Sequence, residues 1–421
     1  MRYSAVMLLV LVGTARAAER PMVFNHPAIS AKHVVFGYAG DFWVVDKEGG
    51  EARRLTSGIG LETHPVFSPD GTQVAFGGEY DGNLDVYLVP IAGGEPKRLS
   101  YHPDPDLPVA WTPDGKSVLF RSTRSSYGRF TQLFTISAEG GPETAVDLPM
   151  AEEGSYSPDG GKLAYVPFTN TRPFPGRYMA WKRYRGGSAP FIWIADLKSL
   201  DIDKIPRTDS NDFNPMWVNS TVYFLSDRDG LTTLFAYDLK TKKVERVLEP
   251  TDSDIKSASA CADAIAFARI GGVFVYDLKD NKARKLDIEV RGDLPGVRPR
   301  LKKVGERIRN IGLSPAGARV VFESRGEILT APAEKGDARN LTMSAGIADR
   351  DPAWSPDGKS IAYFSDESGE YELHLKPQDG LGDVKKYKLG DAPSFYYSPR
   401  WSPDGKRIAY SDKRKQLWYI D

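Results

Sequence analysis

Two nearly identical stretches of ten residues decide the fold, WSPDGKSIAY at 354–363 and WSPDGKRIAY at 401–410. Related stretches recur upstream, and the aspartates of neighbouring copies lie 44, 45 or 47 residues apart. A repeat of this length with strand-like units is typical of β-propeller blades. The weaker copies are FSPDGTQVAF from Phe67, WTPDGKSVLF from Trp111, YSPDGGKLAY from Tyr156 and LSPAGARVVF from Leu313, and blurred copies start at Ile29, Trp217 and Ala260.

The chemistry of each repeat predicts a turn followed by strands. In Ser-Pro-Asp-Gly, proline presets φ at the second turn position, aspartate tolerates the third and glycine takes the fourth. The residues after it alternate and are rich in β-branched and aromatic types, as in a strand. A second half, such as LDVYLVPIAGGEPKRLS at 84–100, indicates two further strands joined by a tight turn. We therefore expect four-stranded blades, repeated because one blade cannot bury its own hydrophobic faces.

Counting the repeats predicts an all-β protein with two propeller regions. Six TolB-like four-stranded blades occupy 25–290, and the proline-containing basic segment 291–310 is a linker. The first two to three blades of a second, incomplete propeller follow at 311–421. Because the last repeat stops after its third strand and an open ring exposes strand edges, we expect a truncated chain.

The N-terminus predicts export. Residues 1–17 combine a basic start, a short apolar stretch and the small-residue pattern Ala15-Arg16-Ala17, which suits signal-peptide cleavage before Ala18. The alternative is a disordered start. No stretch reaches the ~20 apolar residues that a membrane span needs, and 56 basic against 56 acidic residues argue against nucleic acid as a partner.

Arginines gather in the connections that follow the second strand of a blade. In the fourth blade this connection is enlarged to TNTRPFPGRYMAWKRYRGGSAP, 169–190, which contains no acidic residue. The third-blade connection 121–129 lies on the same face, and guanidinium groups bind carboxylates and phosphates. In the alternative reading, these side chains pair with acidic neighbours such as Glu79 or Asp227. The candidates for substrate binding are Arg121, Arg124, Arg183 and Arg185.

The sequence shows no self-contained catalytic centre. It lacks a Gly-x-Ser-x-Gly elbow, a His-Glu-x-x-His pair and a phosphate-binding glycine loop, so we expect no catalytic residue, metal or cofactor. Three of its five histidines, His26, His64 and His102, precede proline at strand starts and are interpreted as packing residues. The acidic stretches HPDPD from His102 and TDSNDF at 208–213 could bind calcium, but neither has the ordered ligand spacing of a calcium loop.

Longer phrases resemble the N-terminal propeller region of tricorn-type serine peptidases, and the likeness covers residues 22–421. The blade phrase alone is weak support, because TolB and the propellers of prolyl-oligopeptidase relatives share it. The more particular phrases, in this order, are MAWKRYRGG (179–187), NPMW (214–217), YFLSDRDG (223–230), RGDLPGVRPR (291–300), APAEKGDARNLT (331–342) and DRDPAWSPDGKSIAYFSDESGEYELHL (349–375).

This resemblance implies a six-bladed propeller followed by a seven-bladed one. It also implies that a helical domain, a PDZ domain and a serine-peptidase domain follow downstream. None of these domains is present in these 421 residues. The serine-peptidase domain would hydrolyse short peptides. In such proteins the propellers act as gated channels, and basic residues beside them hold the peptide's C-terminal carboxylate. The expected partners are therefore peptides, the missing PDZ and peptidase domains and other copies of the chain. The export signal suggests a bacterial periplasmic branch.

Two other hypotheses stay open from the sequence. The first is a free-standing TolB-like propeller that binds a protein in the periplasm, although TolB-like proteins place a small α/β domain before the blades. The second, which ranks last, is a propeller enzyme with a central metal or quinone; it would need inward acids or histidines on successive blades, and the sequence shows no such series.

Overall fold

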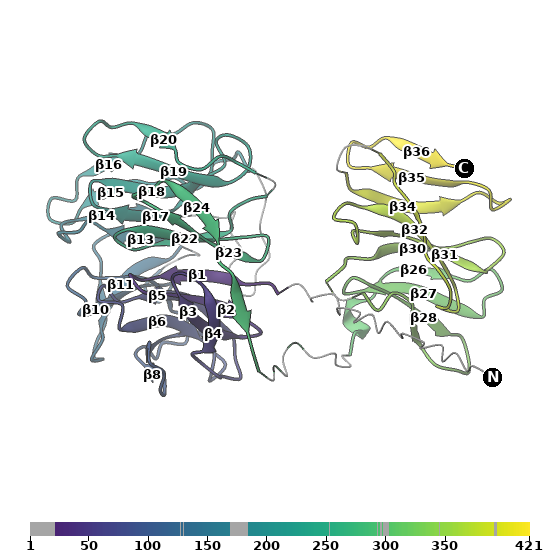
Figure 1. The fold of residues 1–421 in the computed structure, drawn as a ribbon, viewed down its shortest axis with the longest axis horizontal. Helices are drawn as coiled ribbons and strands as arrows, with labels where there is room; N and C mark the ends of the chain where they lie inside the picture. Colours follow the sequence, from purple (N-terminus) through teal and green to yellow (C-terminus); the bar gives the residue numbers. More distant parts are fainter. Residues whose placement is uncertain are drawn as a thin grey trace, which may run out of the picture. The chain divides into compact units, whose positions relative to one another are not determined.

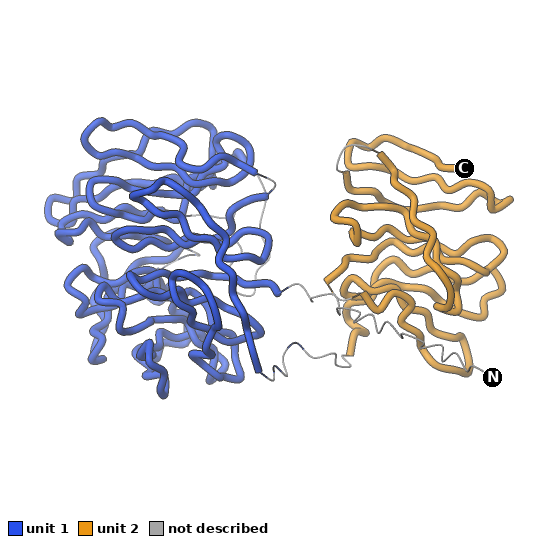
Figure 2. The backbone as a smooth tube through the Cα atoms, viewed as in Figure 1, with its two compact units in different colours: residues 1–298 blue, residues 299–421 orange. Residues whose placement is uncertain are grey.

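The computed structural model describes residues 22–126, 128, 130–168, 184–251, 253–292, 294, 297, 303–344, 346–390 and 394–421. The chain divides into two compact units, residues 1–298 and 299–421 (Figure 2). The expected signal peptide, residues 1–17, lies outside the described residues, and so does most of the fourth-blade insertion.

The first unit contains six sheets, each with four antiparallel strands that are consecutive in the chain (Figure 1). We number these sheets as blades one to six in chain order. The first strands are β1 (Asn25–Ile29), β5 (Glu62–Phe67), β9 (Leu107–Trp111), β13 (Glu153–Tyr156), β17 (Asp212–Val218) and β21 (Ser257–Ala260). The second strands are β2 (His33–Tyr38), β6 (Gln73–Gly78), β10 (Ser117–Ser122), β14 (Lys162–Val166), β18 (Thr221–Ser226) and β22 (Ala264–Arg269).

The third and fourth strands complete these blades. The third strands are β3 (Asp41–Asp46), β7 (Asp85–Pro90), β11 (Gln132–Ser137), β15 (Trp193–Asp196), β19 (Thr233–Asp238) and β23 (Gly272–Asp277). The fourth strands are β4 (Gly50–Arg54), β8 (Lys97–Arg98), β12 (Thr144–Ala145), β16 (Ile202–Lys204), β20 (Val244–Arg246) and β24 (Lys282–Lys285).

The six blades form a closed ring. Their first strands contact one another in a cycle, β1 with β5, β5 with β9 and so on to β21, which contacts β1 again. Each pair of neighbouring blades shares a hydrophobic cluster, for example Phe42 and Val44 of the first blade with Phe76 and Val89 of the second. The last cluster joins the sixth blade to the first. Burial between blades, as the repeats predict, therefore holds the ring together.

A short strand outside the four-strand pattern joins the first blade. This strand, β25 (Ile288–Val290), pairs in parallel with β4, with Ile288 opposite Gly50 and Val290 opposite Ala52. The backbone N–H of Gly50 donates to the carbonyl of Asp287 at 2.8 Å, and Ile288 is 6% exposed. The chain that leaves the sixth blade thus ends the ring as a fifth strand of the first blade.

The repeated turns have the predicted geometry. The N–H of Gly71 donates to the carbonyl of Ser68 at 2.8 Å, and Gly71 has a φ of 71°. The Ser68 hydroxyl donates to Asp70 Oδ1 at 2.6 Å, and this bond lowers the pKa of the Asp70 carboxyl. The same arrangement holds the turn before β31 (Ser360–Ser365), where Ser355 donates to Asp357. The Ser-Pro-Asp-Gly phrase therefore closes its own turn by a side-chain hydrogen bond.

The second unit, taken by itself, contains three further sheets and a 3-10 turn at Gly305–Arg307 among its described residues. Hydrophobic clusters again join neighbouring sheets, as between Phe364 and Tyr410. The last sheet has three strands. The strands are β26 (Arg309–Leu313), β27 (Arg319–Ser324), β28 (Glu327–Pro332), β29 (Arg339–Asn340), β30 (Arg350–Trp354), β31 (Ser360–Ser365), β32 (Glu372–Pro377), β33 (Lys385–Tyr387), β34 (Tyr396–Trp401), β35 (Ile408–Asp412) and β36 (Leu417–Ile420).

Candidate functional site

The first strands of the ring carry bulges that turn polar residues away from the regular ladder. In β1 the register shifts between Asn25 and Ala28, and in β5 it shifts between Thr63 and Val66. The bulged residues His26 and His64 have φ values of 45° and 53°, and each precedes a proline, which cannot donate to the ladder. Asn214 of β17, also before a proline, has a φ of 55°. These positions recur because the blades are repeats, and bulges are common where a strand must redirect a side chain.

Polar contacts at this level run from blade to blade around the ring. The rings of His26 and His64 lie 5.2 Å apart between centroids, and Arg121 Nη2 lies 3.4 Å from His64 Nε2. Glu153 Oε2 accepts from the backbone N–H of Asn214 at 2.6 Å. The Asn214 side chain in turn bonds the backbone of β21 in the sixth blade. We call His26, His64, Arg121, Glu153 and Asn214 the axial collar, because the first strands that carry or contact them surround the ring axis.

Arg121 lies in the strand β10, whereas the sequence interpretation placed it in the connection at 121–129. It is only 8% exposed, and its Nη1 donates to the carbonyl of Glu152 at 3.3 Å. Burial lowers the pKa of the Arg121 guanidinium, and the charge of Glu152 opposes that shift. Because arginine stays protonated in proteins, Arg121 brings a positive charge to the collar. Its contacts join the third blade to the second and the fourth.

Arg124 is engaged within its own blade. Its guanidinium pairs with Asp106, which is fully buried, and with Glu143. Its Nε donates to the Ser122 hydroxyl at 3.2 Å, and its guanidinium carbon lies 5.1 Å from the ring centre of Phe120. Two carboxylates therefore satisfy this arginine, as the alternative of acidic neighbours expects.

The fifth blade repeats the contacts of Arg124 with aspartate, serine and phenylalanine. Arg228 Nη2 donates to the buried Asp212 at 2.9 Å, and its Nε donates to the Ser226 hydroxyl at 3.1 Å. The Arg228 guanidinium lies 5.3 Å from Phe224 and 5.0 Å from Phe235. Because the same arginine, aspartate, serine and phenylalanine recur two blades apart, these contacts belong to the blade structure.

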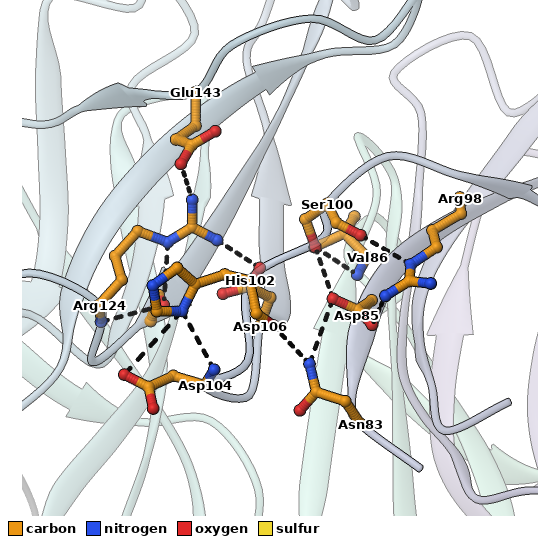
Figure 3. A network of polar contacts seen from close by, with 11 residues as sticks. Asn83, Asp85, Val86, Arg98, Ser100, His102, Asp104, Asp106, Arg124 and Glu143 are labelled. Carbon is orange, nitrogen blue, oxygen red and sulfur yellow. Dashed lines mark hydrogen bonds and ion pairs between the residues drawn. The ribbon is translucent and has the colours of Figure 1, made fainter. Parts of the chain in front are cut away.

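Figure 3 shows the polar network around Arg124 and its neighbour in the second blade. Arg98 Nη2 donates to the buried Asp85 at 2.7 Å, while Arg124 lies between Glu143 and Asp106. A cavity of about 510 Å³ adjoins the network, and Arg98, Arg124 and Glu143 form part of its lining. Each of the two arginines has a carboxylate partner here, so a ligand would have to exchange with a carboxylate of the protein to bind them.

Arg185 pairs with the neighbouring fifth blade. Its Nη1 donates to Asp227 Oδ2 at 2.8 Å, and the same carboxylate accepts from the backbone and side chain of Asn211. This pairing with Asp227 is the one that the sequence offered as the alternative to ligand binding. Arg183, with the rest of 169–183, lies outside the described residues.

In each of the two acidic stretches that the sequence offered for calcium, a carboxylate pairs with an arginine. Asp106 of HPDPD pairs with Arg124, and Asp212, which closes TDSND, pairs with Arg228. In the part of the chain that the structure describes, no group of three or more histidine, cysteine or acidic side chains is arranged to hold a metal. Within the same residues, no helix has the length and apolar character to span a membrane.

The sequence singled out Arg121 but missed its contact with His64. The signal was present, since His26 and His64 occupy the same place in successive repeats, each before a proline. The packing role assigned to these histidines accounts for their mutual contact but not for the polar contact to a third blade.

The similarity of this chain to known proteins includes the six blades of the first ring. A family model described as "Tricorn protease N-terminal beta propeller domain" matches residues 21–282. The tricorn protease homologue of Saccharolobus solfataricus is 26% identical over 368 residues, which cover 86% of this chain and 33% of that protein. Tricorn protease homologue 1 of Streptomyces coelicolor is 28% identical over 375 residues, 87% of this chain and 34% of that protein. This chain therefore spans about a third of the length of these relatives.

A solved structure shares the fold. The crystal structure of the tricorn protease superposes with a TM-score of 0.57 and 18% identity, over 94% of this chain and 47% of that one. With its family match over more than half of its length and its ring of six blades, this chain belongs to the tricorn protease N-terminal β-propeller family.

Proposed function

We propose that this chain is the non-catalytic propeller portion of an exported tricorn-like serine peptidase that hydrolyses short peptides. In this proposal the first ring gates the path of the peptide, and PDZ and peptidase domains downstream in the same protein complete the enzyme. Family membership and the coverage of a third of longer peptidase relatives support it. The three sheets at 309–420 would be the first blades of a second, seven-bladed propeller, because they pack on one another as the blades of the first ring do.

Within the first ring, Arg121 is our choice for the residue that binds the C-terminal carboxylate of the peptide. The observation that carries this choice is a positive charge held at the inner strands by contacts to two neighbouring blades. Arg124 and Arg185 bond Asp106 and Asp227, as the alternative of acidic neighbours expects. Arg183 stays a candidate on its sequence position alone.

Titration calorimetry of the 421-residue chain with a short peptide tests this role. A free C-terminal carboxylate should bind, and its C-terminal amide should bind about 10- to 150-fold more weakly, since charged hydrogen bonds contribute about 1.5–3 kcal/mol. Arg121→Lys keeps the charge but loses the planar fork, and should remove most of that difference. If the chain binds neither peptide but binds a protein of the periplasm in a fixed ratio, the TolB-like alternative replaces this proposal.

Export is tested separately at the N-terminus. Expressed with residues 1–17 in a bacterium, the protein should reach the periplasm and begin at Ala18 by N-terminal sequencing. A bulky residue in place of Ala17 should block this processing, whereas the same change at the preceding Arg16 should be tolerated. Cytoplasmic protein that still begins at residue 1 or 2 would contradict export.

A further inference from the structure

The contacts of His64 assign its protonation. A guanidinium has donors only, so His64 Nε2, 3.4 Å from Arg121 Nη2, must accept. The proton of the neutral imidazole then lies on Nδ1, which faces the Thr63 hydroxyl at 2.8 Å. Thr63 is 4% exposed, so this hydroxyl is held within the protein. The hydrogen bond at one ring nitrogen thus decides what the other can do.

The backbone and a neighbouring ring fix the direction of the imidazole. His64 is the bulged residue of β5 with a φ of 53°, and Pro65 follows it directly. The ring of His26 lies 5.2 Å away at an interplanar angle of 32°. An imidazole held by its backbone, by Thr63 and by a neighbouring ring presents Nε2 in one direction.

Arg121 needs a partner that fixes the direction of its side chain. Its long side chain starts on a second strand and contacts His64 of β5 in one neighbouring blade and the carbonyl of Glu152, just before β13, in the other. Without partners that fix it, a side chain of this length would lose considerable rotamer entropy on binding a ligand. His64 and the carbonyl of Glu152 hold two of its terminal nitrogens, one on each side.

We propose that His64 is a positioning residue that, as the Nδ1–H tautomer, orients Arg121 toward a peptide carboxylate on the axis of the first ring. This inference rests on the proposed function, because it concerns the same peptide site. It adds a histidine acceptor that acts through the arginine and does not touch the peptide.

Two substitutions separate this role from packing. Asn tolerates positive φ well, but its short amide does not reach Arg121, so His64→Asn removes the acceptor while suiting the backbone. His64→Gln carries an acceptor at about the distance of Nε2 and is the conservative rescue. We expect His64→Asn to weaken binding of the free-acid peptide about tenfold without weakening the amide, and His64→Gln to stay within about threefold of wild type. His33→Gln, at a histidine on the second strand β2, is the matched control and should change neither affinity.

Nitrogen-15 NMR of the unchanged protein provides the readout that packing would not move. His64 should show a protonated Nδ1 and an unprotonated Nε2, and Arg121→Lys should alter the Nε2 resonance. An Nε2–H tautomer would overturn the inference, as would equal losses in His64→Asn for acid and amide peptides. Failure of every peptide to bind the wild-type chain would overturn the proposed function itself, whereas a normal acid preference in His64→Asn overturns only the role of His64.

Discussion

At the scale of single residues, the sequence does not distinguish a loop arginine that binds a ligand from one that pairs with a carboxylate of the protein. The cluster of basic residues in the sequence predicts that Arg124 and Arg185 bind substrate. The structure instead places buried carboxylates beside both. The partner Asp106 lies 18 positions from Arg124, and Asp227 lies 42 from Arg185. The sequence named Asp227 as a possible partner but could not decide between a carboxylate of the protein and one of a ligand, and it did not single out Asp106.

The repeated arginine–aspartate pair predicts a loss of stability. In Arg124→Ala, the buried Asp106 carboxylate would lose its partner, which typically costs about 3–5 kcal/mol. Arg228→Ala, its equivalent in the fifth blade, should cost a similar amount. Urea denaturation followed by circular dichroism measures both.

Lys242→Ala removes the exposed pair with Asp203 and is the control, expected to cost less than about 1 kcal/mol. An unchanged free energy of unfolding in Arg124→Ala would mean that this arginine is available for another role.

Glu62 predicts a pH dependence of stability. Burial raises the pKa of its carboxyl above the usual 4.5, although Thr56, Tyr80 and the Phe42 N–H donate to it. Folding thus favours the protonated form, so this contribution is fully present below the ordinary pKa and is lost as the pH rises through the raised value. Glu62→Gln should therefore gain melting temperature relative to wild type between pH 4 and pH 8.

Thermal melts at several pH values measure the difference between the two proteins. Glu79→Gln, at an exposed neighbour, should follow the wild type throughout. A constant difference between wild type and Glu62→Gln over that range would show that the carboxyl titrates alike in the folded and unfolded chains.

At the scale of elements, the turns between strands could be predicted from the sequence, whereas the pairing of strands far apart in the chain could not. The turn before β6 follows from Ser68 to Gly71, because proline, aspartate and glycine each suit one position. In contrast, β25 is three residues long and pairs with a strand 238 positions earlier. Nothing local in Ile-Glu-Val marks a parallel partner, so how the ring closes could not be predicted.

The pairing of β25 predicts a specific cross-link. Glu289 lies opposite Glu51, and neighbouring strands about 4.8 Å apart allow a disulfide. In a Cys261→Ser background, Glu51→Cys with Glu289→Cys should oxidise within one chain, as intact mass before and after reduction would show. Glu51→Cys with Arg291→Cys, two positions along, is the matched control. Equal oxidation of the two pairs would contradict the register.

At the scale of the whole molecule, the repeat predicted the six blades of the first ring because each blade must bury its hydrophobic faces against its neighbours. The place of Arg121 could not be predicted in the same way. The sequence put it in a connection, whereas it lies within the strand β10 and contacts His64 of β5 and the carbonyl of Glu152, just before β13. A site assembled from several blades depends on where the ring brings them, and the period of the repeat does not contain that information.

The central claim of our proposal is that these blades are one part of a longer peptidase whose catalytic domain follows them in the same protein. The most direct measurement is the intact mass of the native secreted product, with an assay of short-peptide hydrolysis on the same sample. We predict a mass well above that of residues 18–421 and hydrolysis that a serine-directed inhibitor stops. A mass equal to that of residues 18–421 together with no hydrolysis would contradict it, and would indicate a free-standing binding protein.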